Sequence, residues 1–250
     1  MKKLLELKNV SLNYYTTTDE IVAVKGLSFN CVEGEFTSII GPSGCGKTTI
    51  LSLIAGLLEP TSGIISVDGK NKITQEDMGY MLQKDQLFPW RTIEKNIYLP
   101  LEIKHVNSQE NKKFANLLLK KYGLENFKKK YPNQLSGGMR QRVALIRTLV
   151  SNPKLLLLDE PFSALDSQTR LSVCDDVYRI IKCEKKTTVL VTHDISEAIS
   201  MSDKIIVLTN RPAQVKSIFK PNIKGDSPLR KRESPEFSFW FEKILKELHL

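Results

Sequence analysis

The chain has 250 residues, of which 41% are hydrophobic, so it can fill a folded core and is not disordered throughout. Its net charge of +9 allows an anionic partner, but the lysines are spread along the chain and favour a solvated face. It contains no run of about 18 apolar residues, and its start, MKKLLELKNV, is charged too early for a signal peptide, so we expect none. The cysteines lack zinc or disulfide spacing, so we expect a soluble protein of a reducing cytosol.

The first 35 residues alternate between apolar and polar side chains, with many β-branched and aromatic types and a polar break at residues 16–20. This pattern predicts two or three antiparallel strands. Tyr14 and Tyr15 lie where the first strand ends. Either ring could stack on a flat aromatic base, and either could instead belong to a cross-strand packing pair.

A short apolar run from Phe36 leads into a glycine-rich loop and then into a predicted helix from Thr48 to about Leu58. The loop fills every fixed position of the pattern G-x-x-x-x-G-K-[ST]. Its glycines let successive backbone N–H groups point inward, and the following helix aims its positive end at the same point. Lys47 adds a charge for the β- and γ-phosphates, and Thr48 adds a hydroxyl for Mg²⁺. The strand before and the helix after favour nucleotide binding over a chance turn.

Beyond this helix, IISVDGK predicts a strand closed by Asp68-Gly69, and MGYMLQ predicts a short buried strand that ends at Gln83. The amide of Gln83 can contact both a metal ion and a water. From Lys84 to about Tyr131, polar stretches carry apolar residues at helical spacing. We interpret this part of the chain as a helical insertion in an α/β core. Its spaced apolar residues are Ile93, Ile97, Leu101, Phe114, Leu117 and Leu118.

Ser136, Gly137 and Gly138 precede an apolar-faced helix that runs through Val150. They form a second anion-binding helix start, and a single nucleotide does not obviously need two. The run KLLLLDE is typical of a strand buried on both faces of a parallel sheet. It ends at Asp159, which can hold Mg²⁺ through water, and at Glu160, which can take a proton from an attacking water.

Ser163 to Asp166 cap a further helix, and a strand from Thr187 to Thr192 ends at His193. A lone histidine at a strand end is usually structural. This strand points the same way as the Asp159 strand, toward the edge where ligands collect in α/β sheets, so we interpret His193 as functional. A last strand follows from Lys204 to Thr209. The tail ends in a helix whose apolar stripe predicts docking on its own domain, or otherwise on a membrane or partner: Phe237, Trp240, Phe241, Ile244, Leu245 and Leu248.

Taken in order, these motifs resemble the ATP-binding subunit of an ABC transporter over nearly the whole chain. The matching segments are the phosphate loop, Gln83, the LSGG run at Leu135 to Gly138, LLLLDEP, SALD and His193. The resemblance implies an α/β P-loop NTPase core with an N-terminal antiparallel β subdomain and an inserted helical subdomain. It implies one nucleotide-binding domain over residues 1–250, with the insertion at about 84–150 and a C-terminal tail and helix at about 211–250.

The resemblance also implies an ATPase that uses ATP and Mg²⁺. Two such domains pair head to tail, and each LSGG helix caps the γ-phosphate bound by the other domain, which explains the second anion site. One signature and one complete catalytic set per chain favour a homodimer.

The resemblance assigns a role to each candidate residue by its position. Glu160 would be the general base and His193 would hold the γ-phosphate, and Gln83 and Lys47 complete the catalytic set. Thr48, Gln83 and Asp159 would hold Mg²⁺ and its water. Asp166 would link the two sites of the dimer. The other nucleotide contacts would be Tyr14 on adenine, with Tyr15 still possible, then Gly41, Pro42, Ser43, Gly44, Cys45, Gly46, Lys47, Thr48 and Thr49, and Ser136, Gly137 and Gly138 from the partner.

Because only the nucleotide-binding domain is expected, the resemblance implies separate transmembrane permease subunits and a peripheral motor on the cytoplasmic face of the membrane. The stretches QLFPWRTIEKNI and VTHDISEAISMSDKIIVLTNRPAQV look like the branch that serves importers of nitrate, sulfonates, taurine and some vitamin precursors. An extracytoplasmic solute-binding protein would then be an indirect partner. An exporter motor is the alternative. A soluble ABC ATPase acting on nucleic acid fits less well, since coiled coils, zinc spacing and a second such domain are missing, so we expect no nucleic acid.

Two further hypotheses concern single residues. Gln83 lies at the joint between core and insertion, so Trp90 just beyond it would contact the membrane subunits, unless it is a core residue. Cys45 lies beside Lys47 and a helix start, which favour a reactive thiolate, unless it is a small filler.

Overall fold

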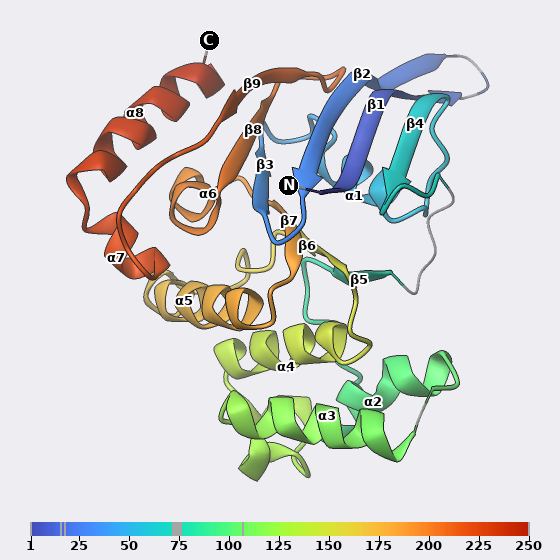
Figure 1. The fold of residues 1–250 in the computed structure, drawn as a ribbon, viewed down its shortest axis with the longest axis vertical. Helices are drawn as coiled ribbons and strands as arrows, with labels where there is room; N and C mark the ends of the chain where they lie inside the picture. Colours follow the sequence, from blue (N-terminus) through green and yellow to red (C-terminus); the bar gives the residue numbers. More distant parts are fainter. Residues whose placement is uncertain (1, 16, 18, 72–76, 107, 250) are drawn as a thin grey trace.

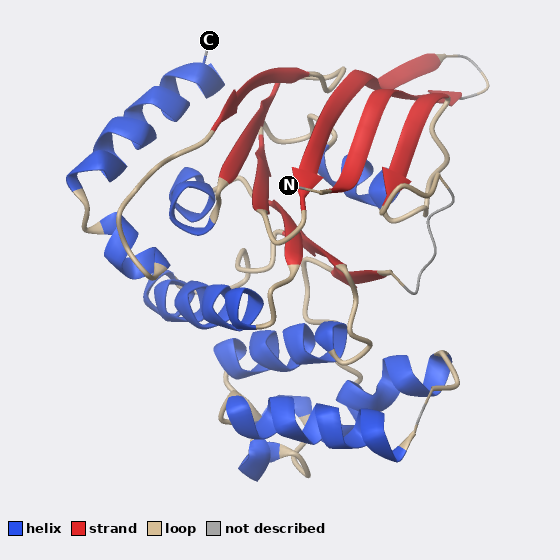
Figure 2. Cartoon of the chain, viewed as in Figure 1, coloured by secondary structure: helices blue, strands red, loops and turns tan. Residues whose placement is uncertain are grey.

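The computed structural model describes residues 2–15, 17, 19–71, 77–106 and 108–249, so positions 16 and 18 of the predicted polar break lie outside the described residues. The described residues form a three-stranded sheet, a six-stranded sheet and the helices around them. Figure 2 shows the smaller sheet beside the larger one, with a group of helices extending from the other end of the molecule. The α/β architecture with an antiparallel subdomain therefore agrees with the prediction.

The smaller sheet has the order β2-β1-β4 and is antiparallel. Its strands are β1 (Lys3–Tyr15), β2 (Glu20–Val32) and β4 (Ser62–Val67). Two strands precede the phosphate loop, as expected, but the third comes after it and pairs with β1. The alternating pattern of each strand indicated one buried face and did not indicate which strands pair.

The larger sheet has the order β5-β6-β7-β3-β8-β9, in which β9 alone is antiparallel. Three of its central strands are entirely buried and rich in β-branched or leucine side chains, which is typical of a parallel sheet covered on both faces. Its strands are β3 (Phe36–Ile40), β5 (Met78–Met81), β6 (Leu155–Asp159), β7 (Thr187–Val191), β8 (Lys204–Leu208) and β9 (Val215–Phe219).

Helix α1 (Lys47–Ile54) contributes Ile50 and Leu51 to a core that contains residues of both sheets. The helix ends four residues before the predicted Leu58. Gly56, whose φ is 67°, adopts the left-handed conformation that commonly follows a helix end. Because α1 is packed against strands, the phosphate loop at its start is firmly held.

The opposite face of the larger sheet is covered by α5 (Ser167–Cys183), α6 (Ile195–Met201) and α8 (Pro235–His249), and α7 (Pro228–Arg232) packs on α5 and α6. Ile244 of α8 is fully buried in a cluster with Ile40 and Ile205 of the sheet. Trp240 meets Phe219 edge to face, with ring centroids 6.2 Å apart. Docking of the C-terminal helix on its own domain is therefore confirmed.

The helical region lies at one end of the molecule, where α2, α3 and α4 gather (Figure 1). It contains α2 (Ile93–Ile103), α3 (Gln109–Lys121), α4 (Gly137–Leu149) and the 3₁₀ turns η1 (Glu125–Phe127) and η2 (Pro132–Gln134). Ile93, Ile97 and Leu101 are buried as predicted. The assignment of Leu117 to the buried face is wrong, because Leu117 is exposed and Leu119 faces the core beside Leu118.

Candidate active site

Strand order brings the predicted site residues to one edge of the larger sheet. Strands β5, β6, β7 and β3 are neighbours and run parallel, so their carboxyl ends meet at the same edge. Gln83 follows β5, Glu160 follows β6, His193 follows β7, and Gly41 follows β3. Ligands of open α/β sheets bind at this edge. Segments far apart in the sequence therefore contribute to a single site.

The phosphate loop uses its glycines for two different reasons. Gly44 and Gly46 have φ values of 73° and 118°, a conformation that other residues rarely adopt. Gly41 is required by close packing, since a Cβ there would lie 3.0 Å from both Cys45 Sγ and Leu208 Cβ. Gly46 precedes α1 without a side-chain cap, so N–H groups of the first helical turn are left for an anion.

Lys47 is 7% exposed and closes back over the loop that precedes it. Its Nζ donates to the carbonyls of Gly41 and Pro42 at 2.8 and 2.9 Å. Among the described residues, no carboxylate lies within ion-pair distance of this ammonium. A buried charge without a counter-ion is costly, so the loop is prepared for a phosphate. Ser43, Gly44 and Thr48 are exposed around it.

Thr48 and Asp159 place a hydroxyl and a carboxylate side by side, with Thr48 Oγ1 donating to Asp159 Oδ1 at 3.3 Å. Tyr80 donates to the other carboxylate oxygen at 3.4 Å. Burial is the main cause that raises the pKa of the Asp159 carboxyl, and a nearby divalent cation would offset it. The described residues contain no cluster of three or more His, Cys, Asp or Glu able to hold a metal alone. This donor pair fits Mg²⁺, which takes one or two protein ligands and completes its shell with phosphate and water.

Glu160 lies at the centre of the arrangement. Its Oε2 is 3.3 Å from Gln83 Nε2 and 3.2 Å from His193 Nδ1. Its φ of 43° is left-handed, which costs a non-glycine residue about 1–3 kcal/mol and is typical of functional sites. The Glu160 N–H donates to Val191, and the carbonyl accepts from Ser163, so both neighbouring segments hold this conformation. Three of the four predicted catalytic side chains, Gln83, Glu160 and His193, therefore converge.

Ser136, Gly137 and Gly138 lie apart from this cluster. Ser136 is exposed and caps α4, its Oγ accepting from the Met139 N–H. Within the described ranges, no hydrogen bond or ion pair joins Ser136 to the phosphate loop. The two glycines also have a packing role, because a Cβ at Gly138 would lie 2.7 Å from Val173 and a Cβ at Gly137 would lie 3.1 Å from Leu165. One chain thus carries the two anion sites separately.

The other candidates have mixed outcomes. Asp166 is exposed at the start of α5 and accepts from the Thr169 N–H at 3.0 Å, a bond that lowers its pKa. Tyr14 and Tyr15 pair with Ile21 and Glu20 at the end of β1 and are 39% and 70% exposed, so either ring is accessible to a base. The expectation of a reactive Cys45 thiolate is wrong, because Cys45 is 1% exposed and burial raises the pKa of its thiol despite Lys47.

Sequence reasoning missed two supporting residues. Tyr80, read only as part of a buried strand, holds Asp159, and no pattern marked it.

Asn96 is fully buried and makes four hydrogen bonds to the turn before α2, through the backbone of Phe88, Arg91 and Thr92. Its signal was an amide on the apolar stripe between Ile93 and Ile97. Asn96 thereby fixes the turn that presents Trp90, which is 71% exposed, so the core alternative for Trp90 is wrong.

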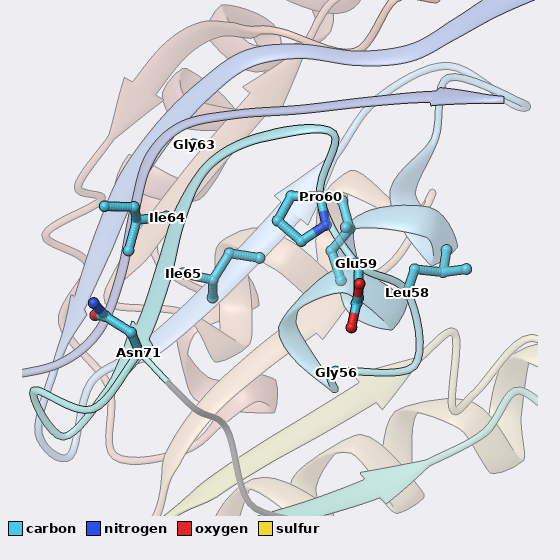
Figure 3. A pocket seen from close by; sticks show the side chains of 9 residues that line it. Gly56, Leu58, Glu59, Pro60, Gly63, Ile64, Ile65 and Asn71 are labelled. Carbon is cyan, nitrogen blue, oxygen red and sulfur yellow. The ribbon is translucent and has the colours of Figure 1, made fainter.

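A cavity of about 430 Å³ lies elsewhere, between the end of α1 and β4 (Figure 3). It is lined mainly by apolar groups such as Leu58, Pro60 and Ile65, with the carboxylate of Glu59. None of the predicted site residues lines it. Its lining does not suit a polyphosphate.

Residues 24–163 match the family model described as ABC transporter, which covers more than half of the chain, so the chain belongs to this family. It is an ATPase that binds ATP, with Mg²⁺ as the accompanying ion, and it has the P-loop ABC ATPase fold. No helix within the described ranges combines the length and apolar character needed to cross a membrane.

Individual relatives are similar over nearly their full length. The chain is 48% identical to an uncharacterized ABC transporter ATP-binding protein, YtlC of Bacillus subtilis, over 98% of this chain and 95% of that protein. It is 36% identical to the nitrate import ATP-binding protein NrtD of Synechocystis (96% and 93% covered) and 36% identical to the aliphatic sulfonates import ATP-binding protein SsuB of Bacillus anthracis (97% and 95%).

A similar solved structure is the dimeric post-hydrolysis state of the ATP-binding cassette MJ0796 bound to ADP and Pi. It is 37% identical, with a TM-score of 0.73, and the match covers 87% of this chain and 98% of that one.

Proposed function

We propose that this chain is the ATP-hydrolysing motor of a multi-subunit importer for a small solute, either a small anion of the nitrate, sulfonate or taurine type or a vitamin precursor. The observation that carries the proposal is the separation of the two anion sites. The half with Lys47 and Glu160 is assembled in one chain, while Ser136, among the described residues, makes no hydrogen bond to that half. A second copy arranged head to tail would complete two ATP sites, and the dimeric relative MJ0796 supports this arrangement.

In this site Lys47 and the loop from Gly41 to Thr49 bind the phosphates. Thr48, Asp159 and Gln83 would hold the Mg²⁺ ion and its bound water. Glu160 accepts the proton of the attacking water, and His193 holds the γ-phosphate and the position of the Glu160 carboxylate. The adenine stacks on Tyr14 or Tyr15. Ser136, Gly137 and Gly138 of the other copy close the site, and Asp166 lies at the joint.

We also propose that the whole chain is one nucleotide-binding domain, with the helical insertion at about 84–150 and the C-terminal tail and helix at about 211–250. Movement of the insertion would start at Gln83, which lies within hydrogen-bonding distance of Glu160 and leads directly into the turn fixed by Asn96. The exposed Trp90, stacked on Phe88 with centroids 5.0 Å apart, gives transmembrane permease subunits a surface to bind. The chain would then be peripheral on the cytoplasmic face of the membrane.

Import is supported by the nitrate and sulfonate relatives, whose names state that activity. An extracytoplasmic solute-binding protein would be an indirect partner. The alternatives are an exporter motor and, with less support, a soluble ABC ATPase acting on nucleic acid.

Co-purification from a membrane fraction tests this proposal. The tagged chain should retain transmembrane subunits, and ATP hydrolysis by the reconstituted complex should rise when a solute-loaded binding protein is added outside. Hydrolysis stimulated by a solute from the ATP side, without any binding protein, would support export. Stimulation of the isolated chain by DNA or RNA, with no membrane subunit retained, would support the soluble ATPase and overturn a transport function.

A further inference from the structure

Arg170 lies in the first turn of α5, between the loop that carries Asp166 and the loop that carries His193. Its Nη2 donates to the Leu165 carbonyl at 2.9 Å. On the other side, its Nη1 lies 3.6 Å from Asp194 and its Nε lies 4.0 Å from Glu197. A planar guanidinium can face both loops at once, whereas a single ammonium cannot.

The two acids that face Arg170 hold the turn that carries His193. Asp194 accepts backbone N–H bonds from the first turn of α6. Glu197 is 3% exposed and accepts from the Thr192 hydroxyl at 2.6 Å, and that hydroxyl accepts from the Asp194 N–H at 3.1 Å. Thr192 and Asp194 flank His193 on both sides. Their bonds therefore determine where the imidazole is held.

On its other side, Arg170 bonds to Leu165, and Leu165 packs against Gly137 of the LSGG run. The Leu165 side chain is buried, and its Cδ2 lies 3.1 Å from the place that a Cβ at Gly137 would occupy. Since protein cores are closely packed, Leu165 cannot shift without moving the start of α4 or leaving a void. A continuous set of contacts thus runs from His193 through Arg170 to Gly137.

These contacts are uneven in strength. The bond from Arg170 to Leu165 has hydrogen-bond length, whereas the approaches to Asp194 and Glu197 are longer than hydrogen bonds. The Nε of Arg170 is buried and, among the described residues, has no hydrogen-bond partner. A small movement of Glu197 toward Arg170 would satisfy this donor.

We propose that Arg170 is a positioning residue that couples the two ATP sites of the dimer, an inference that rests on the proposed function. In that dimer, His193 contacts the γ-phosphate bound to its own chain. Gly137 belongs to the LSGG run, which closes the ATP site of the partner. Loss of the phosphate moves the His193 loop, and Arg170 and Leu165 transmit the shift to the opposite site. Arg170 contacts no substrate atom in this scheme.

The test compares Arg170→Lys and Arg170→Met with the unmodified chain in ATP hydrolysis measured over a range of Mg-ATP concentrations. We expect the unmodified chain to be cooperative, with a Hill coefficient above 1. Both variants should fall to a Hill coefficient of 1, because a coupling between sites that usually changes affinity by about 5-fold to 150-fold is lost, and kcat should be lower. Binding of a fluorescent ATP analogue without Mg²⁺ should stay within about twofold, because no phosphate contact is removed.

Arg179→Met is the matched control, since Arg179 lies on the same helix, its side chain is 68% exposed, and its ion pair among the described residues is with Asp175. It should leave the Hill coefficient and kcat unchanged. The lysine variant keeps the charge and guards against misfolding of the methionine variant. A cooperative unmodified chain together with an Arg170→Lys variant of identical kcat and Hill coefficient would overturn the coupling role alone. An unmodified chain that neither dimerises nor hydrolyses ATP would overturn the proposed function, and the inference with it.

Discussion

The two halves of the proposed ATP site differ in how much strain they carry. The half around the phosphate loop contains a buried ammonium at Lys47, a carboxyl of raised pKa at Asp159 and a left-handed backbone at Glu160. The half around Ser136 is an exposed, well-capped helix start. Unfavourable features therefore gather where we propose that phosphate and metal bind, whereas the half proposed to meet a partner is relaxed in the isolated chain.

Replacing the catalytic carboxylate should have the largest effect. Glu160→Gln keeps the shape of the side chain and removes the proposed base, so hydrolysis should fall about 10²-fold to 10⁴-fold while ATP binding survives. With the γ-phosphate uncleaved, the ATP-bound protein should accumulate as a dimer in size-exclusion chromatography. Glu242→Gln, on the exposed side of α8, is the control. Hydrolysis at the unmodified rate would exclude Glu160 as the base.

The relaxed half can be disturbed without disturbing the strained one. Ser136→Asp keeps a good helix cap but places a negative charge against the partner's γ-phosphate, so ATP binding to the monomer should persist. Dimer formation and hydrolysis should fall together by at least about 10-fold, since like charges in a closed interface cost several kcal/mol. Ser108→Asp makes the same exchange at the cap of α3 and should change neither. If Ser136→Asp dimerises with Mg-ATP like the unmodified chain, the head-to-tail arrangement is wrong.

Within the strained half, Lys47→Ala removes the positive charge that we propose binds the phosphates. Binding of Mg-ATP, followed by calorimetry, should weaken by about 10-fold to 100-fold, as expected for loss of hydrogen bonds to a charged group. Dimer formation should fail because the phosphates are no longer held. Lys120→Ala, on the exposed side of α3, should bind ATP normally. Normal binding by Lys47→Ala would mean that the backbone N–H groups suffice.

The sequence predicted the residues of the strained half better than the residues that hold them in place. A glycine-rich loop or an acid at a strand end has a chemical reason visible in the sequence, and the parallel sheet then requires Glu160 and His193 to meet. Tyr80 meets Asp159, and Arg170 meets Asp194 and Glu197, which are distant in sequence, and no local pattern encodes such contacts. Cys45 shows the opposite error, because a helix start and a lysine suggested a thiolate while burial, which only the fold determines, dominates its pKa.

The fold shows the same division. The apolar run of β6 predicted a buried strand because its composition alone requires cover on both faces. The pairing of β4 with β1 could not be predicted, since alternation indicates a buried face without indicating the neighbour.

Trp90 lies outside both halves, and replacing it tests whether the turn that follows Gln83 binds the membrane subunits. Trp90→Ala should weaken retention of membrane subunits by about 10-fold or more, since exposed aromatic anchors contribute about 2 kcal/mol or more at interfaces. Binding of ATP and the thermal midpoint of the isolated chain should barely change, because the side chain is 71% exposed. Phe239→Ala, at 60% exposure on α8, is the matched control in the same pull-down. Equal retention of the two variants would remove Trp90 from the proposed interface.

The smallest expected effect is a pH dependence of stability caused by Glu197, which accepts a hydrogen bond from Thr192 next to His193. Burial raises the pKa of the Glu197 carboxyl from 4.5 to about 6, and this outweighs the opposing influence of the Thr192 hydrogen bond and of Arg170 and Arg232. The folded chain then binds this proton more tightly than the unfolded chain does, so its contribution to stability is present below pH 4.5. It is lost as the pH rises from 4.5 to about 6, by about 2 kcal/mol at most.

Glu197→Gln should therefore gain stability relative to the unmodified chain over that pH range, because glutamine has no proton to lose and its oxygen still accepts from Thr192. The measurement is urea unfolding of both proteins at intervals between pH 4 and 7, read as the difference in free energy of unfolding so that other titrating groups cancel. Glu242→Gln should give a flat difference. A flat difference for Glu197→Gln as well would mean that this buried acid titrates normally, and that the strain of the catalytic half does not extend to the support of its histidine.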